Sequence, residues 1–183
     1  MKWFKEMNLP NQLTIIRILL IPVFLFFLFI TEGIFRLLPL IIFIGAAVTD
    51  TIDGHIARRD NLITDFGKFM DPLADKLLTV SAFIAFVEIG YLGSWVVILI
   101  ISREFIISGI RTLAASKGVT IAANNWGKIK TVFQMVLIVI ILMHYTTYMD
   151  FVTPIINPLV IITVLLTLVS GGTYIYQNIK VLR

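Results

Sequence analysis

Long apolar runs are the feature that most constrains how this chain can fold. Of its 183 residues, 58% are hydrophobic and 14% are charged. A helix needs roughly 20 apolar residues to cross the hydrocarbon core of a bilayer, where it satisfies its own backbone polar groups. We therefore predict an all-α integral membrane protein with six transmembrane helices. The predicted spans cover residues 10–30, 35–58, 69–89, 92–115, 125–145 and 152–181.

The rest of the chain gives no sign of a second domain. No internal repeat, low-complexity tract or linker interrupts residues 1–183, so we predict a single membrane domain whose six-helix bundle covers 10–181. Residues 1–8 are mixed and amphipathic, which favours a short interfacial helix with Trp3 facing the lipid; a frayed terminus fits the same residues. They lack the features of a cleaved signal peptide. The chain has no cysteine, which excludes disulfides and thiolate metal ligands.

The distribution of basic residues predicts the orientation in the membrane. With the N-terminus in the cytoplasm, every lysine and arginine except Arg36 falls on the cytoplasmic side, as the positive-inside rule requires. Both termini are then cytoplasmic, and the charged candidate site residues lie on the cytoplasmic side of the membrane. The net charge of +4 is spread between apolar runs, which indicates topology and contact with acidic headgroups and argues against nucleic acid as a partner.

Four aspartates at the ends of the second and third spans form the candidate site. Asp50 and Asp53 are three residues apart, so on a helix their side chains share a face. They rise about 4.5 Å apart along the helix axis. Gly54 and Ala57 lie on the same face and leave it hollow, which gives room for a ligand. Arg58 lies at the rim, where a guanidinium can meet a phosphate.

The next helix repeats this pattern, because Gly67, Asp71 and Asp75 follow one another at four-residue steps. Four converging carboxylates repel one another unless cations separate them, and ligands that are all oxygens favour Mg²⁺ or Mn²⁺. We expect two divalent ions, since metal pairs recur in phosphoryl chemistry. The alternative is a set of solvated helix ends. That alternative suits Asp60 and Asp65 but does not explain two acidic stripes that each carry a small residue.

The two stripes together resemble the signature of the CDP-alcohol phosphotransferase family. The pattern is D-x-x-D-G-x-x-A-R, then eight residues, then G-x-x-x-D-x-x-x-D, and every fixed position is present. The resemblance implies a six-helix membrane enzyme, usually a homodimer, with its site at the cytoplasmic surface. It assigns the role of general base to Asp75. The metal ligands that it implies are Asp50, Asp53, Asp71 and Asp75. The cytidine diphosphate pocket that it implies is lined by Gly54, Ala57, Arg58 and Gly67.

Flanking stretches resemble one bacterial branch of this family, whose acceptor is sn-glycerol 3-phosphate. These stretches are residues 8–17, 102–105, 109–111 and 126–131. An acceptor with its own phosphate needs fixed cations, and the candidates are Arg103, Arg111, Lys128 and Lys130. Positive-inside topology and contact with anionic lipid are the alternative explanation. Arg103 lies far inside its span, which favours a function, and Glu104 beside it can help to hold it.

Two further pairs leave alternatives open. Asn11 and Thr14 lie three residues apart at the start of the first span, where they either hydrogen-bond the nucleotide or cap and pack the helix. Gly171 and Gly172 mark a bend or a close packing point in the last span. Because small residues let helices approach in lipid, packing is favoured.

The sequence thus predicts a multi-pass enzyme of a bacterial plasma membrane, with its active site facing the cytoplasm. The resemblance implies transfer of the phosphatidyl group of CDP-diacylglycerol to sn-glycerol 3-phosphate, with release of CMP. Inositol phosphate or serine as acceptor is the nearest alternative. A cation transporter is a more distant one, since acidic intramembrane sites also carry ions. The position of the aspartates near one surface argues against a transporter.

Overall fold

The computed structural model describes residues 7–30, 33–59, 64–119, 121–122, 124–148 and 150–182. Side chains are described within these ranges except at 33–34, 50–59, 65–66, 68–69 and 180–182. The interfacial helix predicted at 1–8 therefore lies almost entirely outside the described residues. The side chains of five predicted site residues also lie outside them: Asp50, Asp53, Gly54, Ala57 and Arg58.

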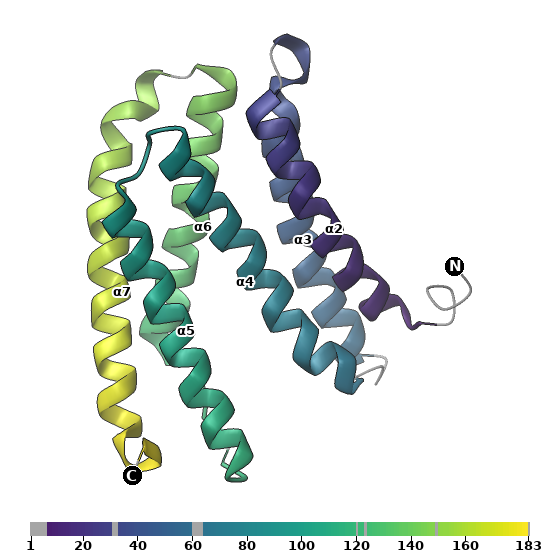
Figure 1. Ribbon diagram of the computed structural model, residues 1–183, viewed down its shortest axis with the longest axis vertical. Coiled ribbons are helices and arrows are strands. Elements are labelled where there is room, and N and C mark those ends of the chain that lie inside the picture. The colour runs from purple at the N-terminus through teal and green to yellow at the C-terminus, as the bar shows by residue number, and fades with distance from the viewer. Residues whose placement is uncertain are drawn as a thin grey trace. The chain divides into compact units, whose positions relative to one another are not determined.

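The described residues form helices joined by short turns and loops, with no strand among them (Figure 1). The elements are α2 (Leu9–Ile30), η1 (Gly33–Leu37), α3 (Leu38–Arg59), α4 (Asp65–Glu88), α5 (Ser94–Ser116), α6 (Asn125–Thr147), η2 (Asp150–Val152) and α7 (Thr153–Leu182). Six α-helices thus coincide with the six predicted spans, and the all-α prediction is confirmed for this part of the chain.

Among the described residues, three helical stretches are long and apolar enough to cross a membrane. They are Leu9–Ile30, Asn125–Thr147 and Asp150–Ile179. A shorter apolar stretch, Phe35–Thr49, runs from η1 into α3. In α5, the charged residues Arg103, Glu104 and Arg111 interrupt the apolar sequence. Candidate site residues thus lie both on α5 and on the membrane-spanning helices α2 and α6.

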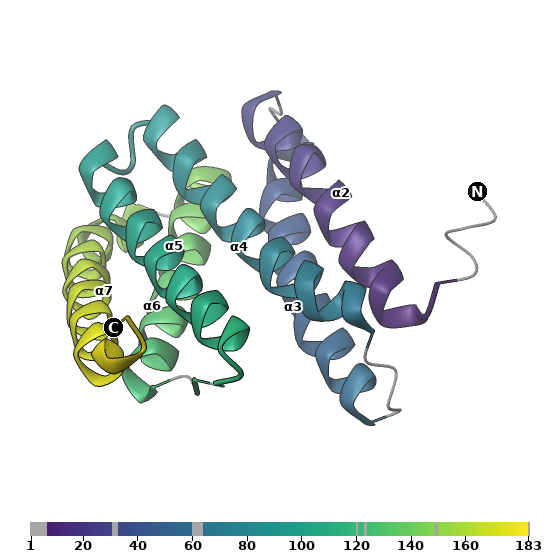
Figure 2. The ribbon, with the colours of Figure 1, turned by 60° about the horizontal axis from the view of Figure 1, so that its bottom comes forward.

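The first of two compact units comprises residues 1–85 and 145–148. In it, α2 packs along α3, as both ribbon views show (Figure 2). The rings of Phe24 and Phe43 meet with centroids 5.9 Å apart. The buried face of α2 changes character along the helix, from polar at its start to apolar at its end: Pro10, Asn11, Thr14, Arg17, Ile21, Phe24 and Leu28. The buried polar residues of α2 therefore lie only in the N-terminal part of the helix.

Arg36 fixes the opposite end of this unit. Its Nε donates to the carbonyl of Tyr145 at 2.9 Å, and its guanidinium lies 3.6 Å from the ring centroid of Tyr148. The hydroxyl of Tyr145 in turn donates to the carbonyl of Leu28 at 3.2 Å. The one arginine predicted on the outer side is thus held within a structural contact.

The second unit comprises residues 86–144 and 149–183 and contains α5, α6 and α7. Helices α5 and α7 lie side by side, and Ile107, Ile110 and Tyr174 form a buried cluster between them. The backbone of α7 departs from helical geometry at Asn178, with φ −115° and ψ 16°, while Gly171 is helical and buried. The packing interpretation is therefore confirmed for Gly171 but not for Gly172, which meets no atom within 4 Å, and the bend lies at Asn178.

Candidate functional site

The start of α4 is the best-defined part of the candidate site. The backbone N–H of Gly67 donates to the Thr64 hydroxyl oxygen at 3.0 Å, which makes Thr64 the N-cap of the helix. The Thr64 hydroxyl donates to Oδ1 of Asn11 at 2.9 Å. This bond ties the start of α4 to the first turn of α2. Thr64 was not among the residues predicted from the sequence, although a threonine directly before an acidic first turn is a common cap signal.

Asp71 is held by Thr14, which is fully buried on α2. The Thr14 hydroxyl oxygen lies 2.5 Å from Oδ1 of Asp71 and 3.1 Å from the carbonyl of Pro10. Because the hydroxyl has one proton and a carboxylate is the stronger acceptor, the proton points to Asp71. The bond fixes the rotamer of Asp71 and leaves its second oxygen, Oδ2, for another partner.

Gly67 provides the space in which these oxygens converge. A Cβ added at Gly67 would lie 3.0 Å from Asn11 Oδ1, 3.3 Å from Thr64 Oγ1 and 3.4 Å from Asp71 Oδ2. Contacts this close force the neighbours to move, so no larger residue fits without displacing the oxygens. The structure therefore brings together four of the site residues predicted from the sequence: Asn11, Thr14, Gly67 and Asp71.

The donor set at this position fits a hard divalent cation. Asp71 and Asp75 are half-buried and lie one turn apart on α4, and the groups around Gly67 are carboxylate, hydroxyl and amide oxygens. Oxygen ligands of this kind suit Mg²⁺ or Mn²⁺. Among the described side chains, no group of three or more histidine, cysteine, aspartate or glutamate residues gathers. Asp50 and Asp53, which the predicted ligand set also contains, are not among those side chains.

Arg17 is a polar residue of this region that the site prediction did not include. It follows Thr14 by three residues on the buried face of α2, and its side chain has no exposed surface. A buried arginine is costly unless it meets a counter-charge or hydrogen-bond acceptors. The signal in the sequence was an arginine inside an apolar run, which we interpreted as a marker of topology and as the end of the stretch 8–17 that resembles one branch of the family.

A second charged cluster lies in the unit formed by α5, α6 and α7. Oε1 of Glu104 accepts from Nη1 of Arg103 at 3.2 Å and also from Nζ of Lys130. The exposed fraction of the side chain is 2% for Lys130, 13% for Arg103 and 18% for Glu104. The predicted support of Arg103 by Glu104 is confirmed. The bond from Lys130 to the same carboxylate oxygen was not anticipated.

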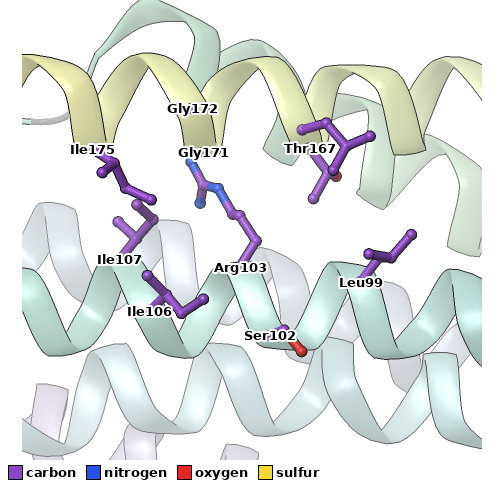
Figure 3. Close-up of a pocket in the computed structure, with 10 residues that line it drawn as sticks. Leu99, Ser102, Arg103, Ile106, Ile107, Thr167, Gly171, Gly172 and Ile175 are labelled. Carbon is purple, nitrogen blue, oxygen red and sulfur yellow. The ribbon is translucent and has the colours of Figure 1, made fainter.

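The side chain of Arg103 packs against two glycines, Gly171 and Gly127. Figure 3 shows it running from α5 toward Gly171 on α7, where an added Cβ would lie 3.1 Å from its Cγ. Its Nη2 lies 3.6 Å from the Cβ position of Gly127, in the first turn of α6. A cavity of about 220 Å³ opens beside it, with Leu99 and Ile107 in its apolar lining. The guanidinium is thus placed at the start of α6.

The other two predicted cations occupy different surroundings. Arg111 lies farther along α5, where its Nε donates to the hydroxyl of Tyr174 at 3.2 Å and its guanidinium lies 5.5 Å from that ring centroid. Arg111 and Lys128 are both exposed. Of the four candidates for phosphate binding, the structure therefore joins Arg103 and Lys130 through Glu104, and it does not join Arg111 or Lys128 to them.

Apolar helices of membrane-spanning length, with charged groups held at helix starts, define a helical membrane protein with a polar site. The family model for CDP-alcohol phosphatidyltransferases matches residues 7–169, and the chain belongs to this family. It is 40% identical to the CDP-diacylglycerol–glycerol-3-phosphate 3-phosphatidyltransferase of Bacillus subtilis, over 96% of this chain and 97% of that one. The Rickettsia felis protein of the same name is 37% identical, over 92% and 94%. A probable phosphatidylglycerophosphate synthase of Mycobacterium tuberculosis is 37% identical, over 94% and 82%.

Proposed function

We propose that this protein transfers the phosphatidyl group of CDP-diacylglycerol to sn-glycerol 3-phosphate, giving phosphatidylglycerophosphate and CMP. The observation that carries the proposal is the convergence of Asn11, Thr14 and Asp71 on Gly67, because it gathers predicted site residues from distant parts of the chain. The names of the relatives support the choice of donor and acceptor, and each relative matches nearly the whole of this chain.

The proposed cofactor is a pair of Mg²⁺ or Mn²⁺ ions. Their ligands would be Asp50, Asp53, Asp71 and Asp75. When bound, such ions would polarise the diphosphate and stabilise the charge that develops on CMP. In this proposal Thr14 orients the carboxylate of Asp71 so that one oxygen remains available. The cytidine diphosphate would lie against a surface made of Asn11, Thr14, Gly54, Ala57, Arg58 and Gly67.

The chemical step is a displacement at phosphorus. The acceptor hydroxyl oxygen forms a bond to the phosphorus that carries diacylglycerol, and the bond between that phosphorus and the CMP oxygen breaks. The hydroxyl proton passes to the carboxylate of Asp75, one helical turn from Asp71. A base beside metal ligands is weak, so the proton leaves late, after the bond to phosphorus has begun to form.

The acceptor carries its own phosphate, which a cationic surface must hold. We assign this role to Arg103, supported by Arg111, Lys128 and Lys130. The fork of a guanidinium matches phosphate oxygens in pairs, which makes Arg103 the principal contact. The glycine seats of its side chain support this assignment, since a fixed arginine loses little freedom when it binds a ligand.

The finer membrane arrangement is also part of the proposal. We infer six spans, both termini in the cytoplasm, and an active site that faces the cytoplasm of a bacterial cell as part of a homodimer. The polar start and apolar end of the buried face of α2 support a site near one surface. Acyl chains of the donor would stay in the bilayer while the nucleotide occupies the polar cavity.

An acceptor panel tests the function. Purified protein is supplied with CDP-diacylglycerol, Mg²⁺ and, in turn, sn-glycerol 3-phosphate, inositol phosphate or serine, and CMP release is measured. We expect CMP in a one-to-one ratio with phosphatidylglycerophosphate, and only with sn-glycerol 3-phosphate. CMP release with another acceptor alone would reassign the acceptor, and ion flux without CMP release would replace the enzyme by a transporter.

A further inference from the structure

In the cluster of Arg103, Glu104 and Lys130, two positive side chains share one negative side chain. Two cations donate to a single carboxylate oxygen, Oε1 of Glu104, in a setting where at least four-fifths of each side chain is buried. Buried charges are tolerated when they are paired and hydrogen-bonded. Because Lys130 draws on the same oxygen, the carboxylate neutralises Arg103 only in part.

The hydrogen bonds of Arg103 leave most of its donors available. A guanidinium has five N–H donors, and within the described structure only Nη1 of Arg103 is paired, with Glu104. Nε is buried without a hydrogen-bond partner among these residues. The bond to Glu104 thus sets the direction of the guanidinium without consuming its capacity to bind an anion.

The surroundings of the guanidinium favour an anion. Asn124 caps α6, since its Oδ1 accepts from the N–H of Gly127 at 2.7 Å. A helix start carries partial positive charge, and Arg103 reaches the first turn of α6 at Gly127. Lys130 lies one turn from Gly127 on the same helix and adds a second positive charge.

We propose that Glu104 and Lys130 are positioning residues for the acceptor, which deepens the proposed function and rests on it. Glu104 aims the guanidinium of Arg103, and Lys130 shares the carboxylate so that Arg103 keeps positive charge for a phosphate monoester. Gly171 is the third positioning residue, because its lack of a side chain lets the aliphatic part of Arg103 pack against α7. Together they select an acceptor that carries a phosphate.

The test measures the KM for sn-glycerol 3-phosphate and for CDP-diacylglycerol in purified variants. Lys130→Met removes the ammonium that shares Oε1 of Glu104, so the carboxylate neutralises more of the charge on Arg103. We therefore expect the KM for sn-glycerol 3-phosphate to rise about tenfold while that for CDP-diacylglycerol stays unchanged. A purely structural role would lower kcat through loss of folded protein and leave both KM values as they were. Lys117→Met, at an exposed lysine, is the matched control.

A pair of adjacent glycines gives an independent test should Lys130→Met fold poorly. Alanine at 171 would push Arg103 Cγ, whereas alanine at 172 meets no atom within 4 Å. Both changes raise helix propensity equally, so their difference isolates the contact. We expect a KM for sn-glycerol 3-phosphate several-fold higher in Gly171→Ala and unchanged in Gly172→Ala. Equal KM values in both variants, in a protein that releases CMP, would overturn the positioning role alone. A wild-type protein without CMP release would overturn the proposed function and this inference with it.

Discussion

The start of α4 and the start of α6 are built alike and carry opposite charge. Each begins after a side-chain cap, Thr64 or Asn124, whose oxygen accepts from the N–H of a glycine three residues on. At Gly67 the neighbouring groups are oxygens, including a carboxylate; at Gly127 a guanidinium lies close by. A capped helix start with a glycine in its first turn therefore serves as a general scaffold. The charge brought in by another residue decides whether it suits a metal or a phosphate.

The largest effect is expected from removing the charge at the α4 site. Asp71→Asn keeps the shape of the side chain but removes a metal ligand, and kcat for CMP release should fall at least about 1,000-fold, because several kcal/mol of charge stabilisation are lost. Asp150→Asn, at an exposed aspartate in η2, should retain full activity. Comparable turnover in both variants would remove the carboxylate site from the account.

A smaller loss is expected when the support of that carboxylate is removed. Thr14→Val has nearly the same volume and deletes the hydroxyl that donates to Asp71. The apparent affinity for Mg²⁺, measured from the dependence of rate on Mg²⁺ concentration, should fall about 10- to 100-fold. Thr112→Val deletes an exposed hydroxyl that donates to Ser108 within α5, and its Mg²⁺ dependence should equal that of the wild type.

Alanine at the two capped glycines should separate the two regions. In Gly67→Ala the new Cβ crowds the oxygens around Asp71, and in Gly127→Ala it crowds Asn124 Oδ1 at 2.9 Å. We expect the KM for CDP-diacylglycerol to rise about fivefold in the first and that for sn-glycerol 3-phosphate about fivefold in the second, from roughly 1 kcal/mol of overpacking. Gly45→Ala and Gly109→Ala, which meet no atom within 4 Å, are the controls. If both variants raised the KM for the same substrate, the assignment of the two substrates to the two regions would be contradicted.

The smallest effect on catalysis is expected at Arg36. Arg36→Gln loses the contact with the Tyr148 ring and weakens the bond to the Tyr145 carbonyl. The free energy of unfolding should fall by about 1–2 kcal/mol, seen as a lower thermal midpoint, with kcat unchanged. A large fall in kcat in folded Arg36→Gln protein would show that charge at this end also takes part in the chemistry.

Much of the helical pattern and part of the site could be predicted from the sequence. Hydropathy indicated the helices, and spacing put Gly67, Asp71 and Asp75 on one face. Thr64 escaped because a single threonine in a polar loop is a weak signal until the helix start is known. With Thr64 as its cap, α4 begins at Asp65, four residues before the predicted start of the third span at residue 69.

Contacts between helices could not be predicted in the same way. Spacing along one helix says which residues share a face, but it does not say which neighbouring helix that face meets. The bond from Lys130 to Glu104 and the seat of Arg103 on Gly171 both join different helices. The full burial of Arg17 escaped for the same reason, since an arginine in an apolar run fits a topology marker as well as a site residue.

The central claim is that one region serves the metal-dependent chemistry while the other holds the acceptor. The most direct measurement is the KM for sn-glycerol 3-phosphate in Thr14→Val and Arg103→Ala, at saturating CDP-diacylglycerol and Mg²⁺. We predict a rise of about 10- to 100-fold in Arg103→Ala, the value of a charged hydrogen-bonded contact, and no change in Thr14→Val. An unchanged KM in Arg103→Ala, or an equal rise in both variants, would contradict the account.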